Sequence, residues 1–396
     1  MDDQLALARS RFVEGIAHFE AGRLAEARSA FEAALGLAPD RPSIVANLGI
    51  TLARLGEAQV AIPLLQKSTR LDPRHVDSWV CLGQIHESRG EWAAAAKALE
   101  QALALEPQHA TLWVSRAHCQ HRLGQLDAAL HSFDRALANE PQAATIWSER
   151  GGLLRELHRL DEAAECFERA LALGADRELN GYFLASVRGT GSVTAPPRRY
   201  VEALFDDYAA DFQQHLVGQL GYRGFEVLLR PLLEAGRRYR RVLDLGCGTG
   251  LCGSLIQPQA EVVDGLDVSS AMLAEAARLG IYRQLIHADL GAFLNTATES
   301  ADLVLAADVF IYVGELSPIF PALRRLLTVG GCLAFTVEKA AEGRDLELLP
   351  SLRYAHSAAY IRRLAGEAGF TVDRMFRAPI RNDQSGAVQG LYCYLS

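Results

Sequence analysis

Positive charge in this sequence comes almost entirely from arginine, because lysine occurs only at Lys67, Lys97 and Lys339. Acidic residues outnumber basic ones, and the formal net charge is −8 at neutral pH. Binding along a nucleic-acid backbone needs clustered lysine and arginine that neutralise phosphates. The charge balance therefore argues against a nucleic-acid substrate.

Sequence features of metal centres, membrane spans and export are also lacking. None of the seven cysteines forms a C-x-x-C pair, and no cysteine–histidine cluster has zinc spacing, so we expect no metal site. Free thiols are typical of a reducing compartment. We predict neither a signal peptide nor a membrane helix, because the start MDDQLALARS is acidic and no apolar run reaches about eighteen residues. The expectation is a cytoplasmic protein with no membrane partner.

A period of 34 residues runs through the first half of the chain. One series consists of small residues, at Gly15, Gly49, Gly83, Ala117 and Gly151. Three further series have the same step: Ala27, Ala61, Ala95, Ala129 and Ala163; Phe31, Leu65, Leu99, Phe133 and Phe167; and Pro39, Pro73, Pro107 and Pro141. Tryptophan follows the period at Trp79, Trp113 and Trp147, and a turn glycine at Gly22, Gly56, Gly90 and Gly124. Such exact repetition predicts stacked structural units of one kind.

Each unit reads as two amphipathic helices around a tight turn. Small residues let the two helices approach closely, large apolar residues fill the space between units, and the proline ends the second helix. The spacing and order of these residues resemble the tetratricopeptide family over roughly residues 8–175. That resemblance implies an all-α solenoid whose groove binds a peptide or protein. Self-association, as in a homodimer, or a purely scaffolding role is the alternative.

The middle of the chain divides into a cap, a linker and a connecting segment. A helix over 176–187 is expected to close the array, so that the repeat domain spans 1–187. Residues 188–199 are rich in Gly, Thr and Pro, which is the composition of a linker. Residues 200–240 carry apolar positions at helical spacing, with Asp206, Tyr208 and His215 as polar groups among them. The first of these helices is either a lid over a catalytic pocket or a helix packed on a sheet edge.

Residues 241–250, RVLDLGCGTG, mark the start of the last domain, 241–396. An apolar strand runs into a glycine turn, which leads into a helix, as in nucleotide-binding α/β sheets. The glycines remove Cβ atoms where ligand and backbone touch. A dinucleotide site typically has G-x-G-x-x-G, whereas the spacing here is G-x-G-x-G. Asp244 just before the turn disfavours phosphates and suits a cationic amino-acid group.

Acidic residues end the next three predicted strands. Asp267 follows the strand over 262–266, Asp289 follows the third strand, and Asp308 follows the strand over 302–307. An acid at the end of the second strand can accept two hydrogen bonds from a ribose diol. A fifth strand after Gly330, a helix over 358–368 and two last strands complete the chain. These acids and the glycine turn are expected at one edge of the sheet.

This order of elements resembles the class I S-adenosylmethionine-dependent methyltransferases over about residues 240–396. The resemblance implies a Rossmann-like, seven-stranded, doubly wound sheet whose last strand is antiparallel. It also implies that S-adenosylmethionine binds here and leaves as S-adenosylhomocysteine. Together, the repeats and this domain resemble the tetratricopeptide-repeat methyltransferases.

Family roles carry over to individual residues by this resemblance. The methionine part of the cofactor is expected against Asp244, Gly246, Gly248 and Gly250. The ribose is expected on Asp267, with Val268 in the same site, and the adenine on Asp289 and Leu290. Asp308 and Tyr312 are expected to border the methyl group.

The accepting atom determines whether a base is needed. A carboxylate needs none, whereas a hydroxyl or an ammonium group must lose a proton. His356, just past the fifth strand, is the first candidate, with Tyr354, His215 and Asp308 as alternatives. No N-P-P-Y or D-P-P-Y tetrapeptide follows the fourth strand, which disfavours methylation of base or glutamine amino groups.

Three functional hypotheses remain open on the sequence alone. The first is methyl transfer to an oxygen or nitrogen of a peptide or protein that the repeats recruit. The second is a small-molecule methyltransferase whose repeats dimerise or dock a carrier. The third is a non-catalytic adaptor with a relic cofactor domain, which the intact Asp244, Asp267 and glycine turn disfavour.

Overall fold

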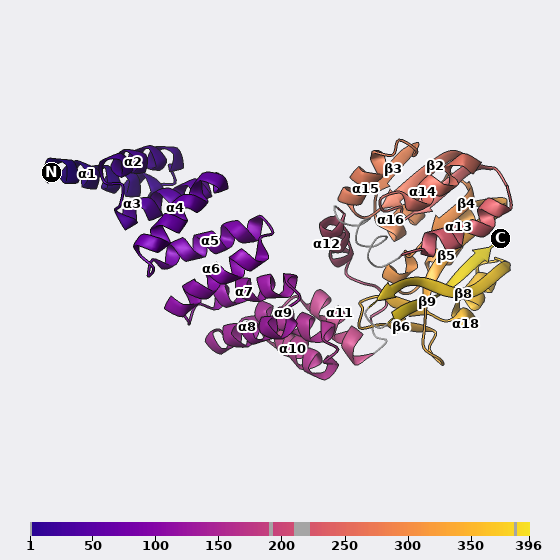
Figure 1. The fold of residues 1–396 in the computed structure, drawn as a ribbon. Coiled ribbons are helices and arrows are strands. Elements are labelled where there is room, and N and C mark those ends of the chain that lie inside the picture. Colours follow the sequence, from indigo (N-terminus) through magenta and orange to yellow (C-terminus); the bar gives the residue numbers. More distant parts are fainter. Residues whose placement is uncertain (1, 190–192, 210–221, 384–385) are drawn as a thin grey trace. The chain divides into compact units, whose positions relative to one another are not determined.

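The computed structural model describes residues 2–189, 193–209, 222–383 and 386–396. The chain divides into two compact units, Met1–Ala175 and Asp176–Ser396. The first unit is entirely helical, and the second contains the β-sheet (Figure 1). Within the described ranges, no helix is both long and apolar enough to cross a lipid bilayer.

The first unit is an array of paired helices at the predicted period. Each pair packs its first helix against its second, and the next pair follows after a short turn. The pairs are α1 (Asp2–Glu20) with α2 (Leu24–Leu37), α3 (Pro42–Arg54) with α4 (Ala58–Leu71), α5 (Val76–Ser88) with α6 (Trp92–Leu105), α7 (Ala110–Arg122) with α8 (Leu126–Asn139), and α9 (Ala144–Glu156) with α10 (Leu160–Ala172). The predicted tetratricopeptide solenoid is confirmed.

Contacts within each helix pair explain why the series of small residues and the series of large apolar residues have the same 34-residue period. A Cβ atom on Gly15 would lie 2.5 Å from the Phe31 ring, and one on Gly151 would lie 2.8 Å from the Phe167 ring. The large side chain of the second helix therefore occupies the space that glycine leaves on the first. The tryptophan series is explained by hydrogen bonds, because the indole Nε1 of Trp113 donates to the carbonyl oxygen of Pro107 at 2.8 Å.

Helix α11 (Arg177–Arg188) groups with the second unit, although we expected this segment to cap the repeat array. The buried Tyr182 on α11 donates a hydrogen bond to the carbonyl oxygen of Leu352 at 2.6 Å. Its ring lies 6.3 Å from that of Tyr354. These contacts explain the grouping, and the role of α11 as a cap stays a prediction.

The second unit is built on one mixed sheet with the predicted doubly wound core. Its strands are β1 (Tyr239–Leu245), β2 (Ala260–Asp267), β3 (Gln284–His287), β4 (Ala301–Ala306), β5 (Leu327–Lys339), β6 (Leu346–Leu348), β7 (Tyr354–His356), β8 (Val372–Asp383) and β9 (Gly386–Leu395). Strands β3, β2, β1, β4 and β5 are parallel neighbours in that order. Strand β9 pairs antiparallel with β5 and with β8, which gives the predicted antiparallel last strand.

Strands β6 and β7 extend the sheet next to β5 and were not predicted from the sequence. Strand β7 pairs parallel with the carboxyl end of β5, where Glu338 lies opposite Ala355, and β6 pairs antiparallel with β7. Each has only three residues, so neither carries a periodic signal.

Helices cover both faces of the sheet. One hydrophobic cluster contains side chains of α16 (Leu290–Thr296), α17 (Ile319–Leu326) and α18 (Ala358–Glu367). The other contains side chains of α13 (Gly224–Glu234) and α14 (Leu251–Ile256). Two further helices, α12 (Arg198–Tyr208) and α15 (Ser270–Ala277), belong to the surroundings of the site described next.

Candidate active site

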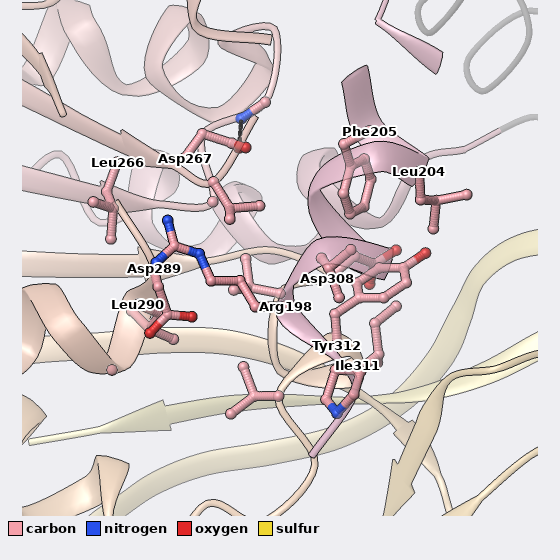
Figure 2. A pocket seen from close by; sticks show the side chains of 18 of the residues that line it. Arg198, Leu204, Phe205, Leu266, Asp267, Asp289, Leu290, Asp308, Ile311 and Tyr312 are labelled. Carbon is pink, nitrogen blue, oxygen red and sulfur yellow. Dashed lines mark hydrogen bonds between the residues drawn. The ribbon is translucent and has the colours of Figure 1, made fainter. Parts of the chain in front are cut away.

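A cavity of about 570 Å³ opens where β1, β2 and β4 end. Open α/β sheets bind ligands in the crevice outside the carboxyl ends of their strands. The wall contains the predicted residues Gly246, Gly248, Asp267, Val268, Asp289, Leu290, Asp308 and Tyr312. Figure 2 shows how Asp267, Asp289, Asp308 and Tyr312 are distributed around it.

The three glycines of the turn have different surroundings. All three have positive φ angles, between 54° and 91°. A Cβ atom on Gly248 would meet nothing within 4 Å, although Gly248 lines the cavity, so the open space belongs to the cavity. A Cβ atom on Gly246 would lie 2.5 Å from Val309, and one on Gly250 would lie 2.5 Å from Leu279. Gly248 is therefore the glycine that leaves room for a ligand.

Asp244 lies behind the turn and supports it. Its Oδ2 accepts hydrogen bonds from the Tyr282 hydroxyl at 2.8 Å and from the Gly253 N–H at 3.1 Å. Burial raises the pKa of this carboxyl to about 7. Asp244 and Gly250 are not among the residues that line the cavity. The cofactor contacts expected of them stay predictions.

Asp267, at the end of β2, lines the cavity, and each of its carboxylate oxygens accepts one backbone hydrogen bond. Its Oδ2 accepts from the Gly248 N–H at 2.8 Å (Figure 2). Its Oδ1 accepts from the Ser269 N–H at 2.9 Å. Each oxygen has a second lone pair. Burial raises the pKa of this carboxyl above its ordinary value. Two hydroxyl donors in the cavity would stabilise the charged form.

Asp289 and Leu290 stand where β3 leads into α16. Asp289 is the N-cap of α16, and its Oδ1 accepts from the Ala292 N–H at 3.0 Å. Leu290 and Val268 supply apolar wall between the acidic groups. This combination suits a flat heterocycle with polar edges.

Asp308 and Tyr312 meet at the other end of the cavity. Asp308 has a φ of 56°, and its Oδ1 accepts from the Thr336 hydroxyl at 2.8 Å. Its Oδ2 accepts from Arg381, which also pairs with the buried Glu338. Burial raises the pKa of the Asp308 carboxyl, and the charge of Arg381 opposes this shift. Asp308 is thus a counter-ion in a buried network.

Of the two histidines considered as bases, the structure describes only His356. His356 is buried in β7, where its Nε2 donates to the carbonyl oxygen of Gly314 at 2.7 Å. Burial lowers the pKa of this imidazole to about 4, and His356 is not among the cavity-lining residues. His215 lies outside the described residues. The role of either histidine as a base stays a prediction.

Helix α12 contributes side chains to the cavity wall, and its role as a lid stays a prediction. Val201, Leu204 and Phe205 line the cavity, and the ring of Phe205 lies 5.1 Å from that of Tyr312 in an edge-on arrangement (Figure 2). Asp206 accepts hydrogen bonds from the Ser269 hydroxyl at 2.6 Å and the Ala271 N–H at 3.3 Å. The helix is thereby joined to the start of α15.

Several contributors to the site were not identified from the sequence. Tyr282 braces Asp244, Arg381 pairs with Asp308, and Arg353 donates from Nε to the Tyr312 hydroxyl at 2.9 Å. Ala195 and Pro196, within the predicted linker, also line the cavity. No local motif marks these residues, because their partners lie far away in the sequence.

The described residues fit S-adenosylmethionine. Gly248 leaves space that a Cβ atom would fill, and Asp267 beside it has two acceptor positions for a ribose. The wall beyond it carries the apolar residues and the polar edge that an adenine requires. Such a mostly apolar cavity with few convergent polar groups is typical of cofactor sites.

Family models match parts of both units. Residues 243–333 match a family model described as a methyltransferase domain. Tetratricopeptide-repeat models match residues 12–76, 46–110, 82–146 and 122–178. A crystal structure of MamA protein superimposes with a TM-score of 0.41 at 22% identity, covering 44% of this chain and 93% of that one.

Curated relatives match parts of the chain. A malonyl-[acyl-carrier protein] O-methyltransferase of Legionella pneumophila is 32% identical over 171 residues, which is 41% of this chain and 58% of the relative. A trans-aconitate 2-methyltransferase of Pseudomonas paraeruginosa is 41% identical over 97 residues, which is 24% of this chain and 34% of the relative. The chain therefore spans less than two thirds of the length of each.

Proposed function

We propose that this chain, which carries tetratricopeptide repeats and a methyltransferase domain, methylates an acceptor borne by a peptide or protein. The methyl donor in this proposal is S-adenosylmethionine, and the accepting atom is an oxygen or a nitrogen. The observation that carries the proposal is the open space beside Gly248, flanked by the two acceptor oxygens of Asp267. A relic domain would have no need to keep that combination.

In this proposal the cofactor extends along the carboxyl edge of the sheet. Gly246 and Gly248 hold the methionine part, with Asp244 behind them. Asp267 accepts from the ribose hydroxyls, and Asp289 and Leu290 contact the adenine. When bound, the cofactor supplies an activated methyl group on a positively charged sulfur, so the protein mainly has to align the acceptor with it.

The far end of the cavity receives the acceptor. Tyr312 and Phe205 form an aromatic wall there, and α12 shields the reacting atoms from water. Asp308 stays in its pair with Arg381, where it contributes a fixed negative charge. A fixed negative charge close to a sulfonium favours binding of the cationic cofactor over its neutral product.

Two considerations support an acceptor carried by a protein. Tetratricopeptide arrays commonly bind peptides or proteins in their groove. One relative is named for a substrate attached to an acyl-carrier protein. A repeat array that holds the carrier would raise the local concentration of its acceptor group at the second unit.

The test compares the full chain with a shortened chain that starts at Asp176. Helix α11 is kept, since Tyr182 is bonded to Leu352 in the second unit. Both chains are first titrated with S-adenosylhomocysteine to confirm that the second unit is folded. Labelled methyl transfer into the macromolecular fraction of a cell extract is then measured. We expect the full chain to transfer label and the shortened chain to lose most of that activity.

A small-molecule methyltransferase is the second candidate, and the name of the trans-aconitate relative favours it. Under that alternative the shortened chain would methylate the small-molecule fraction as well as the full chain does. Binding of S-adenosylhomocysteine without transfer into either fraction would instead favour a non-catalytic adaptor.

A further inference from the structure

The two added strands present one arginine to the cavity. Strands β6 and β7 are joined by a tight turn in which the Leu349 N–H donates to the carbonyl oxygen of Arg353 at 2.9 Å. Leu352 has a φ of 63° in this turn, a left-handed conformation that side-chain-bearing residues rarely adopt. Its carbonyl oxygen accepts from the buried Tyr182, which holds the turn in place. The addition therefore fixes the position of Arg353.

Arg353 keeps most of its hydrogen-bonding capacity unused. Its Nε donates to the Tyr312 hydroxyl at 2.9 Å, and its guanidinium carbon lies 5.8 Å from the centre of the Tyr312 ring. Among the described residues, neither terminal nitrogen of Arg353 has a hydrogen-bond or ion-pair partner. The Tyr312 hydroxyl accepts from Arg353, so its own proton is available to another acceptor. Both side chains line the cavity.

The second arginine deep in this end of the cavity is already neutralised. Arg381 is buried between Asp308 and Glu338 and pairs with both. Arg198 also lines the cavity, but more than half of its side chain is exposed. Within the described part of the wall, Arg353 is thus the partly buried cation whose terminal nitrogens still have donors to offer.

The remaining groups at this end favour one class of acceptor. An ammonium group would be repelled by Arg353, and an alcohol would need a base. No histidine is found among the described residues of the wall. Asp308 is engaged by Thr336 and Arg381, and Glu315 accepts from the Tyr360 hydroxyl at 2.7 Å. A carboxylate fits, because it is already ionised and arginine binds it through paired hydrogen bonds.

We propose that the acceptor is a carboxylate, held by the terminal nitrogens of Arg353 and by the Tyr312 hydroxyl, and that the product is its methyl ester. The inference rests on the methyltransferase function proposed above and narrows its substrate class. The paired donors of Arg353 hold both carboxylate oxygens, and one of these oxygens attacks the methyl carbon through its remaining lone pair. The new O–CH3 bond forms as the S–CH3 bond breaks, and its electron pair stays on sulfur as a neutral thioether. No proton is transferred, which agrees with the lack of a free base among the described residues at this end of the wall.

The test uses the full chain saturated with S-adenosylhomocysteine. Acetate, malonate, glutarate and benzoate are titrated in, each beside its own amide, and binding is followed by calorimetry or ligand-observed NMR. We expect at least one acid to bind about tenfold or more tightly than its amide, as charge-assisted hydrogen bonds imply. Arg353→Gln should remove that preference, and Tyr312→Phe should weaken it.

Matched variants separate a binding role from a structural one. Arg363→Gln is the control, because Arg363 is half-exposed and pairs with Asp345 away from the cavity wall. Arg353→Lys keeps the charge without the paired donors, so it should bind acids more weakly than the unchanged chain and more tightly than Arg353→Gln. The melting temperature and the affinity for S-adenosylhomocysteine should be retained in the Arg353 variants.

Each result bears on one part of the account. If no acid binds better than its amide, or if Arg353→Gln leaves the preference intact, the carboxylate assignment is wrong. If Arg353→Gln weakens S-adenosylhomocysteine as much as the acids, Arg353 belongs to the cofactor and the assignment also fails. If the unchanged chain does not bind S-adenosylhomocysteine, the proposed function itself is refuted. As a second readout, label transferred by the full chain into extract should be released as methanol by mild alkali, whereas alkali-stable label would overturn the inference.

Discussion

Replacing Gly248 with alanine should separate ligand binding from folding. The residue has a φ of 54°, so an alanine there costs roughly 1–2 kcal/mol of stability through its left-handed backbone. The added methyl group has no neighbour within 4 Å, so no further packing cost is expected. A domain of this size loses about 2–4 °C in melting temperature per kcal/mol. The variant should therefore melt roughly 2–8 °C lower and remain folded at 25 °C.

The same methyl group occupies the space assigned to the cofactor. We expect the affinity for S-adenosylhomocysteine to fall at least about tenfold, which corresponds to about 1.4 kcal/mol. Gly250→Ala is the matched control, because its φ of 91° carries a similar backbone cost. Its Cβ would lie 2.5 Å from Leu279 and 3.2 Å from Tyr282, which adds overpacking of about 1–3 kcal/mol.

Calorimetric titration and thermal melting of both variants give opposite patterns under this account. Gly248→Ala should lose affinity with a small change in melting temperature, and Gly250→Ala should lose stability with a smaller change in affinity. Affinity within about twofold of the unchanged chain in Gly248→Ala, equivalent to less than about 0.5 kcal/mol, would refute the reasoning.

Three further substitutions test the surroundings of the site. Asp206→Ala removes the acceptor for Ser269 and Ala271, so amide hydrogen exchange should accelerate across α12. Glu202→Ala, on the same helix, should leave the exchange rate nearly unchanged. Equal exchange in the two variants would contradict the role of Asp206 in joining α12 to α15. Burial lowers the pKa of His356 to about 4, so the imidazole stays neutral in the native chain. As the pH falls from 6.5 to 4, this histidine gains a proton in the unfolded chain but largely not in the native chain. The free energy of unfolding should therefore fall by about 3 kcal/mol over that interval. Denaturant unfolding at both pH values should show a flatter dependence in His356→Gln, and turnover of His356→Ala at unchanged cofactor affinity tests its role as a base. The pKa of Asp244 is raised to about 7, so this carboxyl ionises between pH 6 and pH 8. Ionisation of a buried carboxyl should weaken the ligand-free fold. The same charge should strengthen attraction to the ammonium group of the cofactor. The affinity for S-adenosylhomocysteine should thus rise over that interval in the unchanged chain and stay flat in Asp244→Asn; parallel pH profiles would exclude Asp244 from the cofactor site.

The repeats could be predicted from the sequence because their contacts are local. Gly15 and Phe31, or Trp113 and Pro107, meet within one unit or at its border, so the 34-residue step records the contact directly. The exception is informative: His158 occupies the slot of the turn glycines, and it adopts the same positive φ, at 57°. The period alone gave no sign that a non-glycine residue could fill that position.

The cofactor side of the site could also be predicted from the sequence, since its residues follow directly after strands. Gly248, Asp267, Asp289 and Asp308 all line the cavity at the carboxyl edge of the sheet, as expected from strand order. The acceptor side of the site could not be predicted from the sequence. Arg353 meets Tyr312 across 41 positions, and nothing in either local sequence signals that pairing.

Long-range contacts also changed the interpretation of two segments. Part of the predicted linker is fixed against the second unit, because the carbonyl oxygen of Thr194 accepts from the Glu315 N–H at 2.8 Å. His356, chosen from its place after the fifth strand, is buried and bonded to the carbonyl oxygen of Gly314, and its role as a base stays a prediction. Periodicity identifies elements, but it does not show which side of a three-residue strand faces a cavity.

Calorimetric titration of the full chain and of Asp267→Ala with S-adenosylhomocysteine tests the central claim most directly. Asp267 offers the two acceptor positions assigned to the ribose, and the N–H groups of Gly248 and Ser269 each donate to one of its oxygens. The account predicts micromolar binding by the unchanged chain and its loss in Asp267→Ala, with the variant still folded. Absence of binding to the unchanged chain, or equal binding by the folded variant, would contradict the assignment of this cavity to the methyl donor.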